Sequence, residues 1–119
     1  MASKAHQLGQ ASEAAAAAFL TGLGYEVLYH GYRHARAEVD LVVRQGNELL
    51  VFVEVKARSS SQFGHPETFV TERKKQLFRL AAEHLQETLD WNGDIRFDIL
   101  AVVPTAGGLR IEHFEDAFY

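Results

Sequence analysis

Two charged residues interrupt an otherwise apolar stretch in the middle of the chain. In Leu49–Lys56 the odd-numbered and the even-numbered positions are both mainly apolar, which is typical of a strand covered on both faces. Glu54 and Lys56 lie near the end of this stretch. Side chains two positions apart share one face of a strand. A carboxylate and an ammonium there are costly to desolvate unless they pair or bind something. The pattern therefore indicates either a surface ion pair at a fraying strand end or a reaction centre.

A second carboxylate favours the reaction centre. Asp40 lies on the preceding predicted strand, and a hairpin would bring it close to Glu54. A three-residue loop centred on Asn47 puts the two carboxylates on the same face, whereas a two-residue Gly46–Asn47 turn puts them on opposite faces. The interpretation therefore requires the longer loop or a bulge.

In that register Asp40, Glu54 and Lys56 converge. The two carboxylates and the main-chain carbonyl of Val55 make a hard oxygen site suited to Mg²⁺ or Mn²⁺. Such an ion polarises a scissile phosphate and lowers the pKa of an attacking water. Lys56 would orient or deprotonate that water, or stabilise the developing negative charge. The chemistry indicated is hydrolysis of a phosphodiester.

Glu13 is the candidate for a further ligand and catalytic carboxylate. It shares a helical face with Ala16, Ala17 and Leu20, so we expect it to point toward the core. The alternative is an acidic residue in the first turn of a helix, where the macrodipole favours negative charge. The sequence leaves these two interpretations open.

Basic residues close to these positions are candidates for phosphate contacts. Arg58 stands beside a serine-rich loop, and its planar fork matches a phosphate group. Lys74 lies on the apolar face of a predicted helix, where it either contacts phosphate from the first turn or extends its ammonium to solvent. We assign Arg58, Lys74 and the adjacent Lys75 to nucleic-acid binding.

Other polar residues receive no catalytic role. Asp98 is expected to be a structural partner of Arg96 or of a nearby backbone group. The six histidines are scattered, and His30 and His34 follow a strand and flank Gly31, so a helical zinc pair is not expected.

Helix and strand patterns alternate along the chain and must position these residues. Gln45–Glu48 has the composition of a turn and Ser59–Gly64 that of a flexible loop, and Thr71 is expected to cap the second helix. A helix, strands, a helix and strands again predict an α/β fold with a mixed central sheet flanked by helices. The expected elements are a helix over Ala11–Leu23, strands over Tyr25–Tyr29, Glu38–Arg44 and Leu49–Lys56, a helix to about Leu89, and strands over Ile95–Val103 and Leu109–His113.

Length and composition limit the remaining possibilities. A chain of 119 residues fits a single domain over its whole length, and the absence of cysteine excludes disulfides and thiolate metal sites. No apolar run approaches the roughly 18 residues of a membrane span, and Met1–Gln10 lacks the apolar core of a secretory signal, so a cytoplasmic protein is expected. The net charge of −4 argues against a general nucleic-acid coat. It does not argue against an enzyme whose acidic residues are offset by a cation.

Short motifs in a fixed order run along nearly the whole chain, and together they resemble the YraN-type family of small bacterial proteins. That family is grouped with the PD-(D/E)XK endonucleases and is similar to archaeal Holliday-junction resolvases. Ser12 and Ala37 stand where the family has glycine, and neither change removes a proposed ligand. Alanine at position 37 allows fewer backbone conformations than glycine would. The matching segments are Ser12–Glu13, Gly24–Tyr25, Ala37–Leu41, Phe52–Arg58, Phe63–Gly64, Lys74, Arg96–Asp98, His113 and Ala117–Phe118.

The resemblance implies a restriction-endonuclease-like core and a metal-dependent endonuclease that uses Mg²⁺ or Mn²⁺, with DNA as the expected nucleic acid. Family membership alone does not establish catalysis, because function lies in the site and not in the fold. The alternative is a non-catalytic module that binds nucleic acid or a protein on the same fold. A membrane partner is not expected, and a homodimer is left open.

Overall fold

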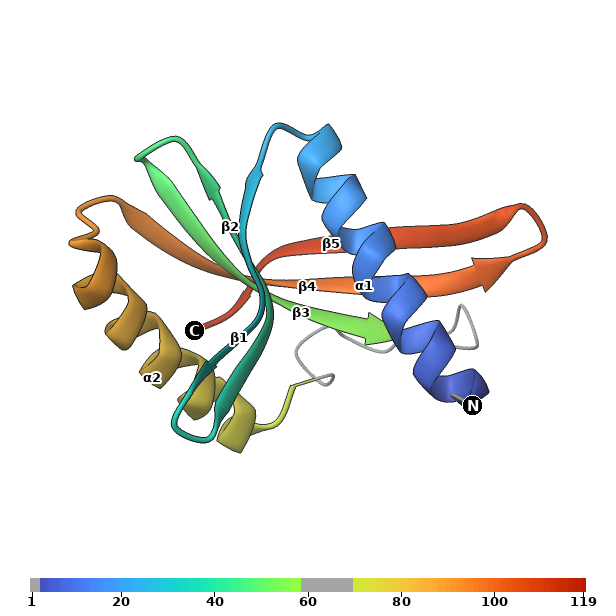
Figure 1. Cartoon of the computed structure of the whole chain (residues 1–119), viewed down its shortest axis with the longest axis horizontal. Helices are drawn as coiled ribbons and strands as arrows, with labels where there is room; N and C mark the ends of the chain where they lie inside the picture. Colours follow the sequence, from blue (N-terminus) through green and yellow to red (C-terminus); the bar gives the residue numbers. More distant parts are fainter. Residues whose placement is uncertain (1–2, 59–69) are drawn as a thin grey trace.

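A computed structural model describes residues 3–58 and 70–119 of the chain. A helix, three strands, a second helix and two strands follow one another along these residues, and the strands form a five-stranded sheet (Figure 1). No helix of the described residues is long and apolar enough to cross a membrane. The elements are α1 (Lys4–Gly22), β1 (Glu26–His34), β2 (Ala37–Gln45), β3 (Leu49–Ala57), α2 (Glu72–Leu89), β4 (Asp94–Thr105) and β5 (Gly108–Phe118).

The sheet is mixed, as the sequence predicts. Its spatial order follows the chain order from β1 to β5. The pairs β1–β2, β2–β3 and β4–β5 are antiparallel, whereas β3 and β4 are parallel. Parallel neighbours cannot be joined by a tight turn, and α2 lies in the connection between them. The predicted α/β architecture, a mixed sheet flanked by helices, is confirmed.

The two helices cover opposite faces of the sheet. Successive side chains of a strand point to opposite faces. On β3, Phe52 packs in one apolar cluster with Phe78 of α2, whereas Val51 and Val53 pack in a second cluster with Leu20 of α1. The central strand is therefore buried on both sides, which explains why its sequence is apolar at both parities.

The loop between β2 and β3 has the length that the candidate site requires. Gln45 pairs with Leu49 and Leu41 with Val53, so three residues, 46 to 48, form the loop. Gly46 has a positive φ of 54°, a conformation that glycine adopts without strain, and the Glu48 N–H donates to the Gln45 carbonyl at 3.2 Å. The predicted register is confirmed from Gln45 and Leu49 to Leu41 and Val53, and Asp40 and Glu54 are the next residues beyond the last pair.

The beginning of β4 packs tightly against this loop. A Cβ at Gly93 would lie 2.6 Å from the main-chain oxygens of Asn47 and of Glu48, so only glycine fits there. The next residue, Asp94, donates its N–H to the Glu48 carbonyl at 2.8 Å. These contacts fix the loop, and with it the pairing of β2 and β3, against β4.

The second helix matches its prediction. Thr71 is the N-cap, and its hydroxyl oxygen accepts a hydrogen bond from the Lys74 N–H at 3.1 Å. Phe78 and Leu85 are buried, while Leu89 at the end of the helix is 37% exposed. The chain leaves the helix through Asp90 in the left-handed conformation.

Three elements extend furthest beyond their predicted bounds. Helix α1 begins at Lys4 and not at Ala11, because a single Gly9 costs only about 1 kcal/mol in a helix and does not end it. Strand β1 continues to His34, because one face of an antiparallel edge strand tolerates polar side chains. Strand β5 continues to Phe118, which is buried, so the predicted aromatic tail is part of the sheet. The predicted Ser59–Gly64 loop lies outside the described residues.

Candidate functional site

Asp40 lies where β2 and β3 stop pairing. The last paired residues on that side are Leu41 and Val53. Asp40 Oδ2 then accepts a hydrogen bond from the Val55 N–H at 2.8 Å. A side-chain oxygen thus takes the place of a main-chain carbonyl of the ladder. This bond fixes the carboxylate of Asp40, which is half-buried, beside the end of β3.

Glu54 is the buried carboxylate of the site. Its side chain is 3% exposed, and Lys74 Nζ of α2 lies 2.6 Å from its Oε2. This ion pair is the contact that Oε2 makes among the described residues. We call Asp40 and Glu54 the carboxylate pair.

Burial and the neighbouring Asp40 both disfavour charge on Glu54. They raise the pKa of the Glu54 carboxyl to about 7, burial being the larger cause, and the ammonium of Lys74 only partly offsets them. The carboxylate pair therefore holds negative charge against its own environment. An additional cation would relieve that charge.

This raised pKa predicts a pH dependence of folding stability in chelator. Between pH 4.5 and 7 the folded protein retains a proton on Glu54 that the unfolded chain has lost, so the group's contribution to stability is complete below about pH 4.5 and falls as the pH rises to 7. At roughly 1.4 kcal/mol per pH unit, the loss is about 3 kcal/mol. We expect Glu54→Gln to remove this loss, measured as the free energy of unfolding in urea at several pH values.

Glu72→Gln is the matched control, because Glu72 is an exposed carboxylate paired with Lys75. It should keep the wild-type pH profile. An identical profile for Glu54→Gln and the wild type would contradict the raised pKa.

Glu13 lies at the rim of the site and not in the core. The buried face of α1 is made by Ser12, Ala16 and Leu20, while Glu13 is exposed, so the prediction that it points toward the core is wrong. The helix is rotated by about one residue from the expected orientation. Partial desolvation and the charge of Asp40 nevertheless raise the pKa of Glu13, which indicates that its carboxyl faces the site.

Lys56 follows Glu54 on the same face of β3 and is half-buried. Within residues 3–58 and 70–119, no hydrogen bond or ion pair engages its ammonium. Glu54 is paired with Lys74 instead. The simpler interpretation of the sequence, an ion pair between Glu54 and Lys56, is therefore wrong.

A cleft of about 300 Å³ opens beside the carboxylate pair, between β2 and the beginning of α2. We call it the β2–α2 cleft. Two of its basic residues, Arg36 and Arg73, were not assigned a role from the sequence, although each belongs to a run of basic residues. Lining residues are Arg36, Glu38, Asp40, Thr71, Arg73, Lys74 and Leu77.

Lys75 and Arg58, the other two predicted phosphate contacts, do not line the β2–α2 cleft. Lys75 pairs with Glu72 at 3.2 Å and lines a separate hollow beside the end of β5, with Phe118. The Arg58 N–H donates to the Val102 carbonyl at 2.9 Å, which continues the pairing of β3 with β4. Of the three predicted phosphate contacts, only Lys74 lines the β2–α2 cleft.

The side chains available for a cation are few. In the described parts of the chain, no group of three or more carboxylate or imidazole side chains lies close enough together to hold one ion. The carboxylate pair supplies two side chains, and the Val55 carbonyl and Glu13 remain candidates beside it. Mg²⁺ commonly binds through one or two carboxylates and keeps several waters, so such a site still fits that ion.

A second buried polar cluster has a structural role. Asp98 is fully buried and accepts two hydrogen bonds from Arg96, both 2.8 Å, and one from the Asp116 N–H at 3.0 Å. His113 Nε2 lies 2.7 Å from its second oxygen, and Arg96 also donates to the Tyr25 hydroxyl. Burial favours the neutral acid, but these partners outweigh it and lower the pKa of Asp98. The prediction that Asp98 pairs with Arg96 or a backbone group is confirmed on both counts.

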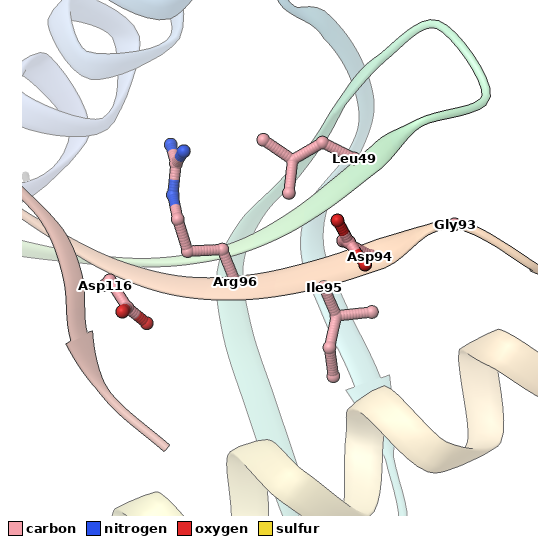
Figure 2. A pocket seen from close by; sticks show the side chains of 6 residues that line it. All are labelled: Leu49, Gly93, Asp94, Ile95, Arg96 and Asp116. Atoms are coloured by element: carbon pink, nitrogen blue, oxygen red, sulfur yellow. The ribbon is translucent and has the colours of Figure 1, made fainter.

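This cluster holds an irregular part of the sheet. The register of β4 and β5 shifts between Phe97 and Ile99, and Asp116 opposite the shift has a positive φ of 53°. Arg96 also lines an open hollow of about 530 Å³ at the beginning of β3 and β4, where Figure 2 shows it and Ile95 on opposite faces of β4. That hollow lies at the other end of β3 from Glu54 and contains neither member of the carboxylate pair.

We expect Asp98→Ala to destabilise the fold by roughly 3 kcal/mol, because it leaves Arg96 without its buried partner. Glu112→Ala is the matched control on the same hairpin: Glu112 pairs with Arg110 at 3.4 Å in solvent, and its loss should cost about 0–1 kcal/mol. Urea unfolding of both variants makes the comparison. Equal losses would show that the Asp98 cluster does not hold the sheet.

Comparison with known proteins identifies relatives along nearly the whole chain. The model of the uncharacterised protein family UPF0102 matches residues 12–102. UPF0102 proteins of Christiangramia forsetii and Flavobacterium psychrophilum are 38% and 41% identical to this chain, over 96% of it and 95% of each relative. One from Chlorobium limicola is 38% identical over 96% of this chain and 93% of its own.

A solved structure, that of Pyrococcus furiosus SfsA in complex with Ca²⁺, aligns at a TM-score of 0.39 with 15% sequence identity. The alignment covers 92% of this chain and 62% of that one, so this chain spans less than two thirds of its length. The sequence relatives carry the assignment: the chain belongs to the UPF0102 family, the YraN-type family indicated by its motifs.

Proposed function

We propose that the protein is a metal-dependent endonuclease that hydrolyses phosphodiester bonds of DNA in the β2–α2 cleft. The observation that carries the proposal is the carboxylate pair. Asp40 is fixed by the Val55 N–H, and Oε2 of the buried Glu54 has the Lys74 ammonium as its partner among the described residues. Two carboxylates held together at the edge of a basic cleft favour binding of a divalent cation over a purely structural role.

The residues present fit Mg²⁺ or Mn²⁺. Asp40 and Glu54 would hold the ion, the Val55 carbonyl is a further candidate oxygen donor, and Glu13 lies at the rim of the site as a candidate outer carboxylate. A bound ion would polarise the scissile phosphate and lower the pKa of a water. The raised pKa of the Glu54 carboxyl supports this assignment, because burial and the neighbouring Asp40 disfavour its charge and Lys74 offsets them only in part.

Lys56 is the proposed catalytic donor. Its ammonium lies on the same face of β3 as Glu54, and Glu54 is paired with Lys74 instead. A lysine near a reacting phosphate orients the attacking water or stabilises the negative charge that develops on the phosphoryl oxygens.

The surroundings of the carboxylate pair suit a nucleic-acid strand. Arg36, Arg73 and Lys74 line the cleft next to Asp40. The lining also includes the carboxylates of Glu38 and Asp40, so basic residues outnumber acidic ones by three to two there, whereas the chain as a whole carries a net charge of −4. Lysine and arginine side chains near phosphates supply most of the non-specific affinity for DNA.

One observation favours the second candidate, a non-catalytic module that binds nucleic acid or a protein. The ion pair between Glu54 and Lys74 neutralises the carboxylate that a cation would need. A protein that had lost catalysis could keep this pair as part of its fold.

Calorimetric titration with Mn²⁺ separates the two candidates when it is combined with a nuclease assay on single strands, duplexes, flaps and four-way junctions. The endonuclease predicts saturable Mn²⁺ binding that Asp40→Asn abolishes, together with Mn²⁺-dependent cleavage of at least one DNA. Absence of binding and of cleavage in the wild type would favour the non-catalytic module.

A further inference from the structure

The ion pair at Glu54 joins two very unequal partners. The Glu54 side chain is 3% exposed, whereas the Lys74 side chain is 36% exposed and lines the β2–α2 cleft. Glu54 is fixed within the central strand and cannot leave its position. The ammonium of Lys74 is carried on a flexible four-carbon stem and can move into the cleft at little cost in packing.

The position of Lys74 in its helix is unfavourable for a positive charge. Thr71 is the N-cap of α2, and its side chain accepts the Lys74 N–H, which places Lys74 in the first turn. The positive end of the helix macrodipole lies there and favours anions over cations. The carboxylate pair must therefore supply the attraction that holds the ammonium 2.6 Å from Glu54 Oε2.

The contact is a short ion pair between the Lys74 ammonium and one carboxylate oxygen of Glu54. Lys74 Nζ lies 2.6 Å from Glu54 Oε2, and this oxygen has no other partner within the described residues. Lys74 thus acts as a point charge, the one property that it shares with a metal ion. A divalent cation and an ammonium cannot both occupy this oxygen, because they repel each other.

We propose that Lys74 is a tethered counter-ion of the carboxylate pair, which neutralises Glu54 in the absence of metal and moves into the β2–α2 cleft when a divalent cation binds. The inference rests on the metal site of the proposed function and adds a regulatory contact to it. Once displaced, the ammonium lies beside Arg36 and Arg73 on the surface where a phosphate would bind. Metal binding would in this way add a positive charge to the substrate cleft.

Amine labelling of the wild-type protein tests the displacement directly. Acetylation by an N-hydroxysuccinimide ester at neutral pH is followed by mass spectrometry, with and without saturating Mn²⁺. We expect Lys74 to react several-fold faster with Mn²⁺, because an ammonium held by a carboxylate is protected. Lys75 is the internal reference, since it pairs with Glu72 away from the cleft and should not change.

Lys74→Met tests the competition, with Lys75→Met as the matched control. Methionine keeps most of the length of the side chain and removes its charge. We expect the Mn²⁺ affinity of Lys74→Met to rise roughly 10- to 100-fold, the scale of one charge-assisted contact that no longer has to be broken. Its melting temperature in chelator should fall, while Lys75→Met should keep the wild-type affinity.

The outcomes distinguish this inference from the proposed function. Tighter Mn²⁺ binding by Lys74→Met supports it, and so does binding by the variant where the wild type binds none. Equal affinities, or Lys74 labelling that Mn²⁺ does not change although calorimetry detects binding, would overturn the counter-ion and leave the metal site intact. No Mn²⁺ binding by the wild type or the variant overturns both.

Discussion

Glu54→Gln is expected to abolish Mn²⁺-dependent cleavage while the protein remains at least as stable as the wild type in chelator. The amide cannot supply the negative charge that the cation needs. It also removes a buried charge that stands beside Asp40, so repulsion within the carboxylate pair disappears. Thermal melting in chelator and the nuclease assay on the mixed panel of DNA structures measure the two effects on the same protein.

Asp40→Asn should have the same effect on cleavage for a related reason. Its side-chain carbonyl can still accept the Val55 N–H, so the end of β3 stays in place. Asp40→Ala leaves that N–H without its partner and should cost about 1–3 kcal/mol of stability in addition. The comparison separates loss of charge from loss of structure.

Glu112→Gln, an exposed carboxylate change away from the cleft, is the control for both and should cut at the wild-type rate. A Glu54→Gln or Asp40→Asn protein that cuts equally fast would exclude the carboxylate pair from the active site.

Lys56→Ala is expected to slow the chemical step by roughly 10²- to 10⁴-fold, the usual scale for a group that transfers protons or stabilises charge. Metal affinity should persist or increase, because a charged lysine is not a ligand and its removal takes away a nearby positive charge. Stability should change little, since Glu54 keeps its ion pair with Lys74. Single-turnover rates at saturating Mn²⁺, with calorimetry on the same variant, separate chemistry from metal binding.

Lys75→Ala controls for the loss of a lysine elsewhere, because Lys75 lies outside the cleft. An unchanged single-turnover rate for Lys56→Ala together with a lowered melting temperature would make Lys56 a structural residue. The proposed mechanism would then have no residue on β3 that orients the attacking water or stabilises the developing negative charge.

The local part of the site was predictable from the sequence, whereas its long-range part was not. Asp40 and Glu54 are joined by a hairpin, so the apolar pattern of β3 and the composition of one turn were enough to place them. Lys74 could be assigned to the apolar face of α2, but the strand residue that it meets depends on how the crossover helix docks. No periodicity in the sequence encodes that contact with Glu54.

The errors in the predicted elements have a similar origin. A helical face is defined only to within about one residue by its alanines and leucines, and this is enough to move Glu13 from the core to the rim. The polar residues that follow Tyr29 suggested a loop. They form an edge strand instead, because pairing with β2 satisfies their backbone groups while their side chains remain in solvent.

The strand order also constrains the route by which the chain folds. The contacts of β1, β2 and β3 close over loops of two and three residues, whereas the parallel pairing of Leu49 with Asp94 must wait for the whole of α2. Short-range pairing precedes long-range pairing when loop closure limits the rate. The β2–β3 hairpin would then bring Asp40 and Glu54 together before Lys74 arrives, against their mutual repulsion. Neutralising Glu54 should accordingly speed refolding from urea more than it slows unfolding, which stopped-flow kinetics in chelator can measure.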